Sequence, residues 1–257
     1  MLSLGLPPYW IDPMFRSLNV FPKPHLFPVV LLSYSMPTDK AAEKSAQSRA
    51  FDRLSPMSCV PVTLSNEIVT LEPIALTHTN DLTEAVDPTV FAYMPMRSSV
   101  VTTNEVRRYI EFQMKRTNTI SFAVIDNATG RAIGSTSYMN ISPDHYGLEI
   151  GSTWITKAAR GTKVNPAMKL LMLKHAIETL GAIRVVLCTD QRNEQSKRAI
   201  SKLGAQFEGT LRNHFIMPDA HQRDTALYSI IPSQWDAIRA GLLARINCEC
   251  AQKKPSS

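Results

Sequence analysis

One stretch of the sequence decides the fold. Residues 147–204 read GLEIGSTWITKAARGTKVNPAMKLLMLKHAIETLGAIRVVLCTDQRNEQSKRAISKLG, which we interpret as strand, basic loop, helix, strand and helix. Residues 147–155 alternate in polarity and carry β-branched side chains, a pattern typical of a strand. Asn165 and Pro166 have the chemistry of an N-cap and of a first helical residue, so they predict where the first helix begins.

The second half of this stretch repeats the pattern. Apolar residues at helical spacing continue to Gly181, a suitable residue to end the first helix. Residues 183–189 then form a buried type of strand. Asn193 caps a second helix, which Gly204 ends. The stretch therefore predicts two strands, each followed by a helix.

The loop between the first strand and its helix has the character of an anion site. Backbone N–H groups in the first turn of a helix have no partner within the helix, and the helix dipole favours negative charge there. Arg160 and Lys163 add positive charge to the loop. One interpretation is that the loop binds the phosphates of a cofactor. The alternative is an ordinary connection with solvated lysines.

Composition narrows the class of protein. The chain has 257 residues, 44% hydrophobic residues and 19% charged residues, which fits a globular protein. The net charge of +6 suits a polyanionic cofactor, whereas no basic stripe interleaved with aromatic residues indicates nucleic-acid binding. The four cysteines have no metal-ligand spacing with histidines, so we expect no metal and a reduced, cytoplasmic protein.

The two ends of the chain differ from the middle. Residues 1–60 are interrupted by prolines, and we expect a disordered N-terminal extension there. Its apolar run, Phe27–Leu32, is too short to span a bilayer, so no membrane association is predicted. Residues 248–257 form a polar tail. The folded domain is therefore predicted to cover residues 61–247.

The rest of that domain also shows local signals. Thr102 and Glu105 form a capping-box pair ahead of a helix, and two alternating runs joined by residues 127–130 predict a β-hairpin. The remaining expected elements are strands at 67–74, 206–215 and 222–231, a short helix at 77–86, and a terminal helix after Pro232. This order of strands and helices indicates an α/β fold with a mixed sheet.

Several short motifs, taken together in this order, resemble the GNAT acetyltransferases, and specifically their RimJ/RimL-like branch. They are Glu149-Ile-Gly-Ser-Thr-Trp-Ile, Arg160-Gly-Thr-Lys-Val-Asn, Lys169-Leu-Leu-Met-Leu-Lys-His-Ala-Ile-Glu, Arg184-Val, Thr189-Asp-Gln-Arg-Asn, Ser196, Ala199-Ile, Lys202-Leu-Gly-Ala, Glu208-Gly, Leu211-Arg and Arg223-Asp. The resemblance covers about residues 65–235. It implies the GNAT fold, in which a centrally splayed sheet is flanked by helices.

The resemblance also implies a cosubstrate and the residues that bind it. Acetyl-CoA would lie where the strands at 147–155 and 183–189 separate, with its pantetheine amides paired to the backbone of Trp154 and Ile155. Its pyrophosphate would lie on the loop formed by Arg160, Gly161, Thr162, Lys163, Val164 and Asn165. The loop departs from the family pattern at Ala158 and at Lys163, where the family usually has glycine or alanine.

The resemblance implies acyl transfer from a thioester to an amine. Glu149 occupies the position where the family often places a carboxylate base, and Ser196 the position whose hydroxyl can reach the sulfur of CoA. Asn193 would cap the helix and also touch the pantetheine. The structural alternatives are an ion-paired Glu149 and a Ser196 that only bonds to backbone.

The acceptor stays open at the level of sequence. The resemblance implies a primary amine, either a protein N-terminus or a small molecule, and the oligomeric state is open between monomer and homodimer. The rival hypothesis is a non-catalytic module that binds acetyl-CoA, which the substitutions at Ala158 and Lys163 motivate.

Overall fold

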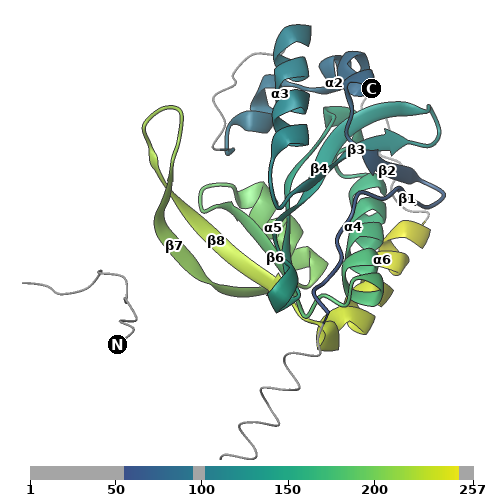
Figure 1. Ribbon diagram of the computed structural model, residues 1–257, viewed down its shortest axis with the longest axis vertical. Coiled ribbons are helices and arrows are strands. Elements are labelled where there is room, and N and C mark those ends of the chain that lie inside the picture. The colour runs from purple at the N-terminus through teal and green to yellow at the C-terminus, as the bar shows by residue number, and fades with distance from the viewer. Residues whose placement is uncertain (1–54, 95–101, 249–257) are drawn as a thin grey trace, which may run out of the picture. The chain divides into compact units, whose positions relative to one another are not determined.

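The computed structural model describes residues 55–94 and 102–248, and within them the chain forms one mixed sheet of eight strands (Figure 1). The strands lie side by side in the order β1-β2-β3-β4-β5-β6-β8-β7. Their bounds are β1 Leu64–Ser65, β2 Val69–Pro73, β3 Ile120–Asp126, β4 Arg131–Ser142, β5 Gly147–Ile155, β6 Arg184–Asp190, β7 Gln206–Ile216 and β8 Gln222–Ile230. The predicted mixed sheet is confirmed.

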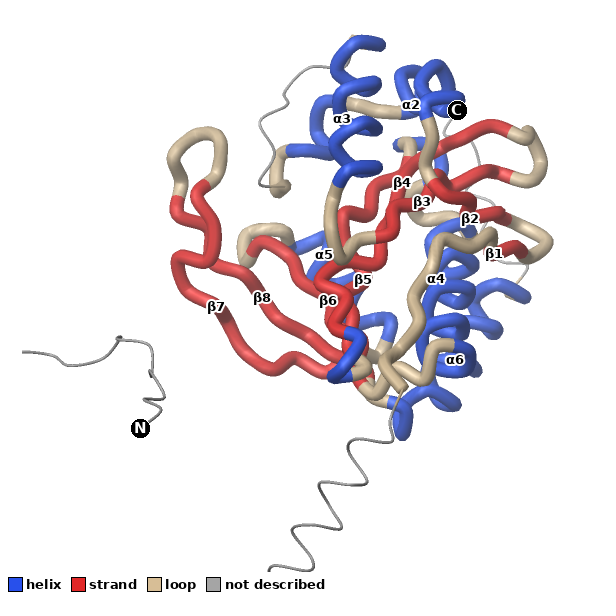
Figure 2. The backbone as a smooth tube through the Cα atoms, in the orientation of Figure 1, coloured by secondary structure: helices blue, strands red, loops and turns tan. Residues whose placement is uncertain are grey.

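Helices cover both faces of this sheet (Figure 2). They are α2 Thr79–Ala85, α3 Thr103–Lys115, α4 Val164–Lys174, α5 Glu194–Leu203 and α6 Trp235–Asn247. Helices α4, α5 and α6 share one hydrophobic core with the sheet, whereas α2 and α3 belong to a second core that includes Trp154 of β5. Each helix therefore buries its apolar side against one of the two faces.

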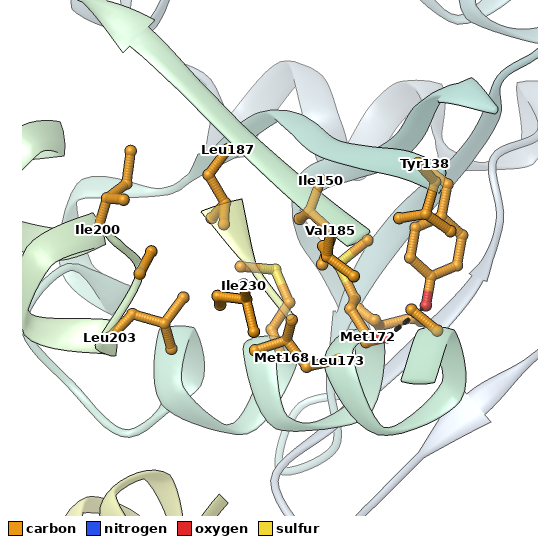
Figure 3. Packing of buried hydrophobic residues seen from close by; sticks show 14 of the residues in the cluster. Tyr138, Ile150, Met168, Met172, Leu173, Val185, Leu187, Ile200, Leu203 and Ile230 are labelled. Atoms are coloured by element: carbon orange, nitrogen blue, oxygen red, sulfur yellow. Dashed lines mark hydrogen bonds between the residues drawn. The ribbon is translucent and has the colours of Figure 1, made fainter. Parts of the chain in front are cut away.

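The main core lies between α4 and the centre of the sheet (Figure 3). Met168, Met172 and Leu173 of α4 are fully buried there, and they face Ile150 and Val185 of the sheet. Burying a side chain of this kind stabilises a fold by about 1.5–3 kcal/mol. This packing fixes α4, and with it the loop before α4, against β5 and β6.

Strands β5 and β6 pair over only three positions before they separate. The last parallel pair is Glu149 with Val186. Beyond it, β5 continues its pairing with β4 as far as Ile155, and β6 continues with β8 as far as Asp190. The facing edges of 150–155 and 187–190 are therefore unpaired, and we call this opening the splay. The predicted splay in the centre of the sheet is confirmed.

A β-bulge interrupts β5 inside the splay. Gly151 pairs with Ser137 and Trp154 pairs with Ser135, so three steps along β5 match two along β4. The extra residue is accommodated at Ser152, whose φ is +47°. Because a bulge shifts the alternation of side chains, Trp154 packs with α3 while Ile155 packs with the α4 core.

The predicted helix boundaries are partly confirmed. Thr102 and Glu105 form the expected capping box of α3, and Asn193 caps α5, which ends at Gly204. The predicted start of α4 was wrong, because the helix begins at Val164 with Lys163 as N-cap. Pro166 therefore lies in the third position of the first turn, where its missing N–H would in any case have no partner in the helix.

The end of this helix also has a different form from the expected one. After α4, residues His175–Thr179 form a π-helical turn, and the chain then leaves the helix at Gly181, whose φ is +71°. A glycine accepts this left-handed conformation without steric cost. The predicted termination at Gly181 is confirmed, although the last turn is wider than in an α-helix.

The N-terminal boundary of the packed chain lies near Met57. Met57 is only 4% exposed and belongs to the main core, and its N–H donates to the carbonyl of Pro143 at 3.1 Å. The predicted extension falls mostly on residues 1–54, and most of the predicted tail falls on residues 249–257. Both ranges lie outside the described residues, so these boundaries stay predictions. None of the helices in the described ranges is long and apolar enough to cross a membrane.

Candidate active site

Glu149 lies where β5 and β6 begin to separate. It is the last residue of β5 that pairs with β6, and its Oε2 accepts a hydrogen bond from Asn140 Nδ2 at 2.8 Å. Burial raises the pKa of this carboxyl above its ordinary value, against smaller opposing effects of Asn140, Arg223 and Arg116. A carboxylate with a raised pKa, placed at the splay, is suited to accept a proton.

Cys188 lies beside this carboxylate on β6. Burial, followed by the negative charge of Glu149, raises the pKa of the Cys188 thiol to about 12. The thiol is therefore protonated near neutral pH, and a protonated thiol is a poor nucleophile. The local chemistry favours a base at Glu149 over a covalent intermediate on Cys188.

The loop before α4 has the free backbone groups that an anion site requires. The N–H groups of Gly161, Lys163 and Asn165 have no hydrogen-bond partner among the residues that the structure describes. Gly161 has a φ of +79°, which turns the chain into the first turn of α4. Thr162 supports this turn, because its hydroxyl donates to the carbonyl of Ala159 at 2.7 Å.

Arg160 is fixed in place by two contacts. Its guanidinium donates to Asp87 Oδ2 at 2.7 Å and, through Nε, to the carbonyl of Ile155 at 3.3 Å. The ion pair holds the end of β5 and the start of the loop together. The side chain therefore positions the loop, and its positive charge is partly compensated by Asp87 before any ligand binds.

The predicted backbone partners of the pantetheine lie in the unpaired part of β5. Trp154 pairs with Ser135 on the β4 side, which leaves the edge toward β6 open. Its ring is buried, and Nε1 donates to the hydroxyl of Tyr109 at 3.3 Å. The carbonyl of Ile155 already accepts from Arg160, so we expect its contribution to come from the N–H group or from its apolar side chain.

Asn193 and Ser196 lie at the start of α5, after the end of β6. Asn193 Oδ1 accepts from the backbone N–H of Ser196 at 3.0 Å, which is the expected cap. The Ser196 side chain is half-buried, and its hydroxyl makes no hydrogen bond within the described ranges. The hydroxyl is thus free to act on a ligand in the splay, as the sequence predicts.

Sequence reasoning missed two buried basic residues. Lys169 of α4 is 8% exposed, its Nζ donates to Thr153 Oγ1 at 3.2 Å, and burial lowers its pKa to about 7. Arg223 of β8 is 6% exposed. A signal for Lys169 was available, because it lies between apolar residues in a helix that is apolar on most sides. No comparable signal marked Arg223.

The described side chains do not form a metal centre. No group of three or more histidine, cysteine, aspartate or glutamate side chains that could hold a metal ion is found in residues 55–94 and 102–248.

The positive φ of Gly161 leads to a prediction about the loop. Replacement by alanine meets no neighbouring atom, so the expected loss of about 1–2 kcal/mol reflects only the cost of the left-handed conformation. We expect Gly161→Ala to weaken acetyl-CoA binding about fivefold or more, because the loop can relieve the strain by turning its N–H groups away. Isothermal titration and urea unfolding measure the two effects.

Gly130 provides a matched control for this prediction. It has a φ of +68° and equally free surroundings, but it lies in the turn between β3 and β4. Gly130→Ala should lower stability to a similar extent and leave acetyl-CoA affinity unchanged. Equal affinities of the two variants would show that the conformation of Gly161 does not matter for binding.

Comparison with known proteins agrees with this geometry. Residues 69–206 match the family model described as the acetyltransferase (GNAT) domain. An acetyltransferase crystal structure from T. thermophilus is 33% identical, covers 74% of this chain and 100% of its own, and has a TM-score of 0.69. A GCN5-related N-acetyltransferase from Brucella melitensis is 25% identical over 80% of this chain and 96% of its own, with a TM-score of 0.73.

The chain therefore belongs to the GNAT acetyltransferase family, whose members use acetyl-CoA. This confirms the resemblance found in the sequence. A Bacillus subtilis (strain 168) protein described as "Putative ribosomal N-acetyltransferase YdaF" is 28% identical over 107 residues, which cover 42% of this chain and 57% of that protein. Mycobacterium smegmatis RimJ, solved in complex with CoA-disulfide, shares the fold at 17% identity, with a TM-score of 0.59 over 74% of this chain and 97% of its own.

Proposed function

We propose that this chain transfers the acetyl group of acetyl-CoA to a primary amine. The observation that carries the proposal is the position of Glu149, a buried carboxylate where the central strands separate. An unpaired strand edge extends from this carboxylate toward the helix N-terminal loop with free N–H groups. These features suit one elongated ligand with a reactive group at one end and phosphates at the other.

The fit of acetyl-CoA follows from the groups that are free to bind it. The open edge of β5, including Trp154 and Ile155, can pair with amides of the pantetheine as an added strand would. The N–H groups of Gly161, Lys163 and Asn165 can bind the pyrophosphate with the help of the helix dipole. Thr162 and Val164 complete this loop, and Arg160 holds it against Ile155. Asn193 shapes the opposite wall of the splay.

Two side chains of the protein are assigned to proton transfer. As the amine nitrogen attacks the thioester carbonyl, its proton passes to Glu149, directly or through one water. The new bond is N–C and the broken bond is C–S. Ser196 donates a proton to the departing sulfur, so the products are an amide and free CoA. The raised pKa of Glu149 makes it a better base than an exposed carboxylate.

The class of amine is the open part of this proposal. The Bacillus subtilis relative is described as a ribosomal N-acetyltransferase, which supports a protein N-terminus as acceptor. A small amine that reaches Glu149 would satisfy the same chemistry.

The proposal is tested by acetyl-CoA binding and CoA release on the full chain. Saturating acetyl-CoA at about 100 times its dissociation constant should stabilise the fold by roughly 2.7 kcal/mol, which raises Tm by several degrees. A panel of N-terminal peptides and small amines should then release free CoA, detected with a thiol reagent. A rise in Tm with no CoA release from any acceptor would instead support the non-catalytic module. No rise in Tm would contradict both functions.

A further inference from the structure

Two buried polar groups on β8 lack a hydrogen-bond partner. Arg223 Nε and Thr225 Oγ1 are unsatisfied, and only one other buried side-chain atom in the described residues shares this property, Gln191 Oε1. Arg223 and Thr225 are two positions apart on one strand, so their side chains lie on the same face of the sheet. Buried polar groups are nearly always hydrogen-bonded in folded proteins. Two unsatisfied neighbours therefore indicate a partner that the protein itself does not supply.

This pair lies on the same face of the sheet as Glu149. Glu149 pairs with Val186, Val186 pairs with Ser229, and alternate residues from Ser229 along β8 lead to Thr225 and Arg223. The charges of Arg223 and Glu149 influence each other's pKa. The unsatisfied groups are therefore close to the proposed base, on the side of the sheet opposite α4.

The acidic side chains near Arg223 already have other partners. Asp190 accepts two hydrogen bonds from the guanidinium of Arg192, at 3.0 Å and 2.8 Å. Glu149 Oε2 accepts from Asn140. Neither carboxylate makes an ion pair with Arg223 within 4.0 Å in the described residues. The nearest acids thus leave the Arg223 guanidinium without a close counter-charge.

The contacts that Arg223 does make leave most of its donors free. Nη1 donates to the carbonyl of Tyr93 at 3.1 Å, and the guanidinium lies 5.4 Å from the centre of the Phe215 ring. Tyr93 and Phe215 are each 39% exposed, so a thin cover separates Arg223 from solvent. A buried guanidinium without a counter-charge is costly, and burial lowers the Arg223 pKa.

We propose that Arg223 binds a carboxylate of the acceptor, so that this enzyme selects amines that carry a carboxylate near the reactive nitrogen. The guanidinium presents planar donors that match a carboxylate with two parallel hydrogen bonds. The Thr225 hydroxyl can donate a further one. The shared chemistry is found in the α-carboxylate of a free amino acid and in the side-chain carboxylate of an N-terminal aspartate or glutamate. The inference rests on the proposed acetyl transfer for its meaning, but not for its binding test.

Charge around the site also disfavours the opposite class of acceptor. Arg116, Arg192 and Arg223 all act on the ionisable groups of this face. Their positive field repels a polyamine, and it lowers the pKa of an amine held near Glu149, which helps the amine to lose its proton. An acceptor with one carboxylate gains from the field without losing reactivity at nitrogen.

The test compares acceptors that differ only in charge. Free alanine is paired with alaninamide, and a tripeptide that begins with aspartate is paired with one that begins with asparagine. In the wild type we expect kcat/KM to be at least tenfold higher for the charged member of one pair, and that pair identifies the source of the carboxylate. Arg223→Gln should remove this preference and leave the neutral acceptor within about threefold of wild type.

Two further variants keep the result interpretable. Arg223→Lys keeps a positive charge and should retain part of the preference, so recovery in this variant separates recognition from folding. Arg212→Gln removes an equal charge from an exposed position on β7 and should leave the preference intact. Equal loss with both members of a pair, in an Arg223→Gln protein that still shows the acetyl-CoA rise in Tm, would overturn the proposal. So would the absence of any charge preference in wild type.

A binding measurement distinguishes failure of this inference from failure of the proposed function. The same four acceptors are titrated against wild type and Arg223→Gln in the presence of CoA, which cannot react. Tighter binding of the charged members to wild type alone supports the carboxylate site even if no acceptor is acetylated. Equal binding to both proteins contradicts it even if acetylation is rapid.

Discussion

Replacing Glu149 by glutamine should lower kcat by about 10²- to 10⁴-fold, the usual contribution of a general base. Glutamine keeps the size of the side chain and can still contact Asn140, but it cannot accept the proton of the attacking amine. Affinity for acetyl-CoA should change little, because the proposed phosphate loop lies at the other end of the splay. Steady-state CoA release and isothermal titration measure the two quantities separately.

The pH dependence gives this prediction a second readout. Since burial raises the pKa of Glu149, kcat/KM in the wild type should fall as pH decreases through a value above the ordinary 4.5. The carboxylate is the active form, so the rate is retained on the alkaline side of that pKa. Glu149→Gln should lose this acid limb altogether.

Asn140 allows a finer test of the same assignment. Its hydrogen bond to Glu149 lowers the carboxyl pKa, so Asn140→Gly should move the acid limb to higher pH while the plateau rate is kept. Glycine is chosen because Asn140 has a φ of +48°. Full activity of Glu149→Gln, with an unchanged acid limb, would show that another group removes the proton.

Replacing Lys169 by methionine should make the protein more stable at pH 6, by about 2–4 kcal/mol. Burial lowers the pKa of Lys169 from 10.5 to about 7, so folding must either bury a charge or release a proton. Its one hydrogen bond, to Thr153 at 3.2 Å, offsets only part of this cost. Methionine has a similar length and carries no charge.

The sign of the pH effect follows from the two pKa values. Between pH 7 and pH 10.5 the unfolded chain binds more protons at this lysine than the folded chain, so the contribution of Lys169 to unfolding free energy rises with pH. The advantage of Lys169→Met should therefore be largest below about pH 7 and nearly absent above about pH 10.5. Urea unfolding at about pH 6 and about pH 10 measures this difference.

Lys174 is the matched control for this experiment. It is exposed at the end of the same helix, so Lys174→Met should produce no gain at pH 6. If Lys169→Met were less stable than wild type at pH 6, the amine would have a stabilising role that outweighs the cost of burying it.

Local signals in the sequence were enough to predict most of the fold. Capping residues such as Thr102 and Asn193 act within a few residues of their own position, and alternation of apolar residues reveals a strand wherever one face is buried. The start of α4 was misplaced because Asn165 and Pro166 are ordinary helix-opening residues, whereas packing of Val164 in the core extends the helix by an extra turn position. Tertiary contacts of this kind are invisible in a local pattern.

The candidate site was only partly predictable, for a related reason. Glu149 and the loop at 160–165 are adjacent in sequence to the strand and helix that position them, so the motif could point to them. Arg223 reaches the same face only because β8 is inserted beside β6, and its missing partner is a property of three-dimensional surroundings. The ion pair between Arg160 and Asp87 likewise joins residues 73 positions apart.

The strand order also has a consequence for how the chain can fold as it is made. The last strand, β8, lies between β6 and β7, so β7 has no neighbour in the sheet until residues 222–230 are available. A ribosome-bound chain that ends before residue 230 would expose the edges of both β6 and β7. Completion of the sheet, and of the proposed carboxylate site on Arg223, must therefore wait until nearly the whole protein has emerged.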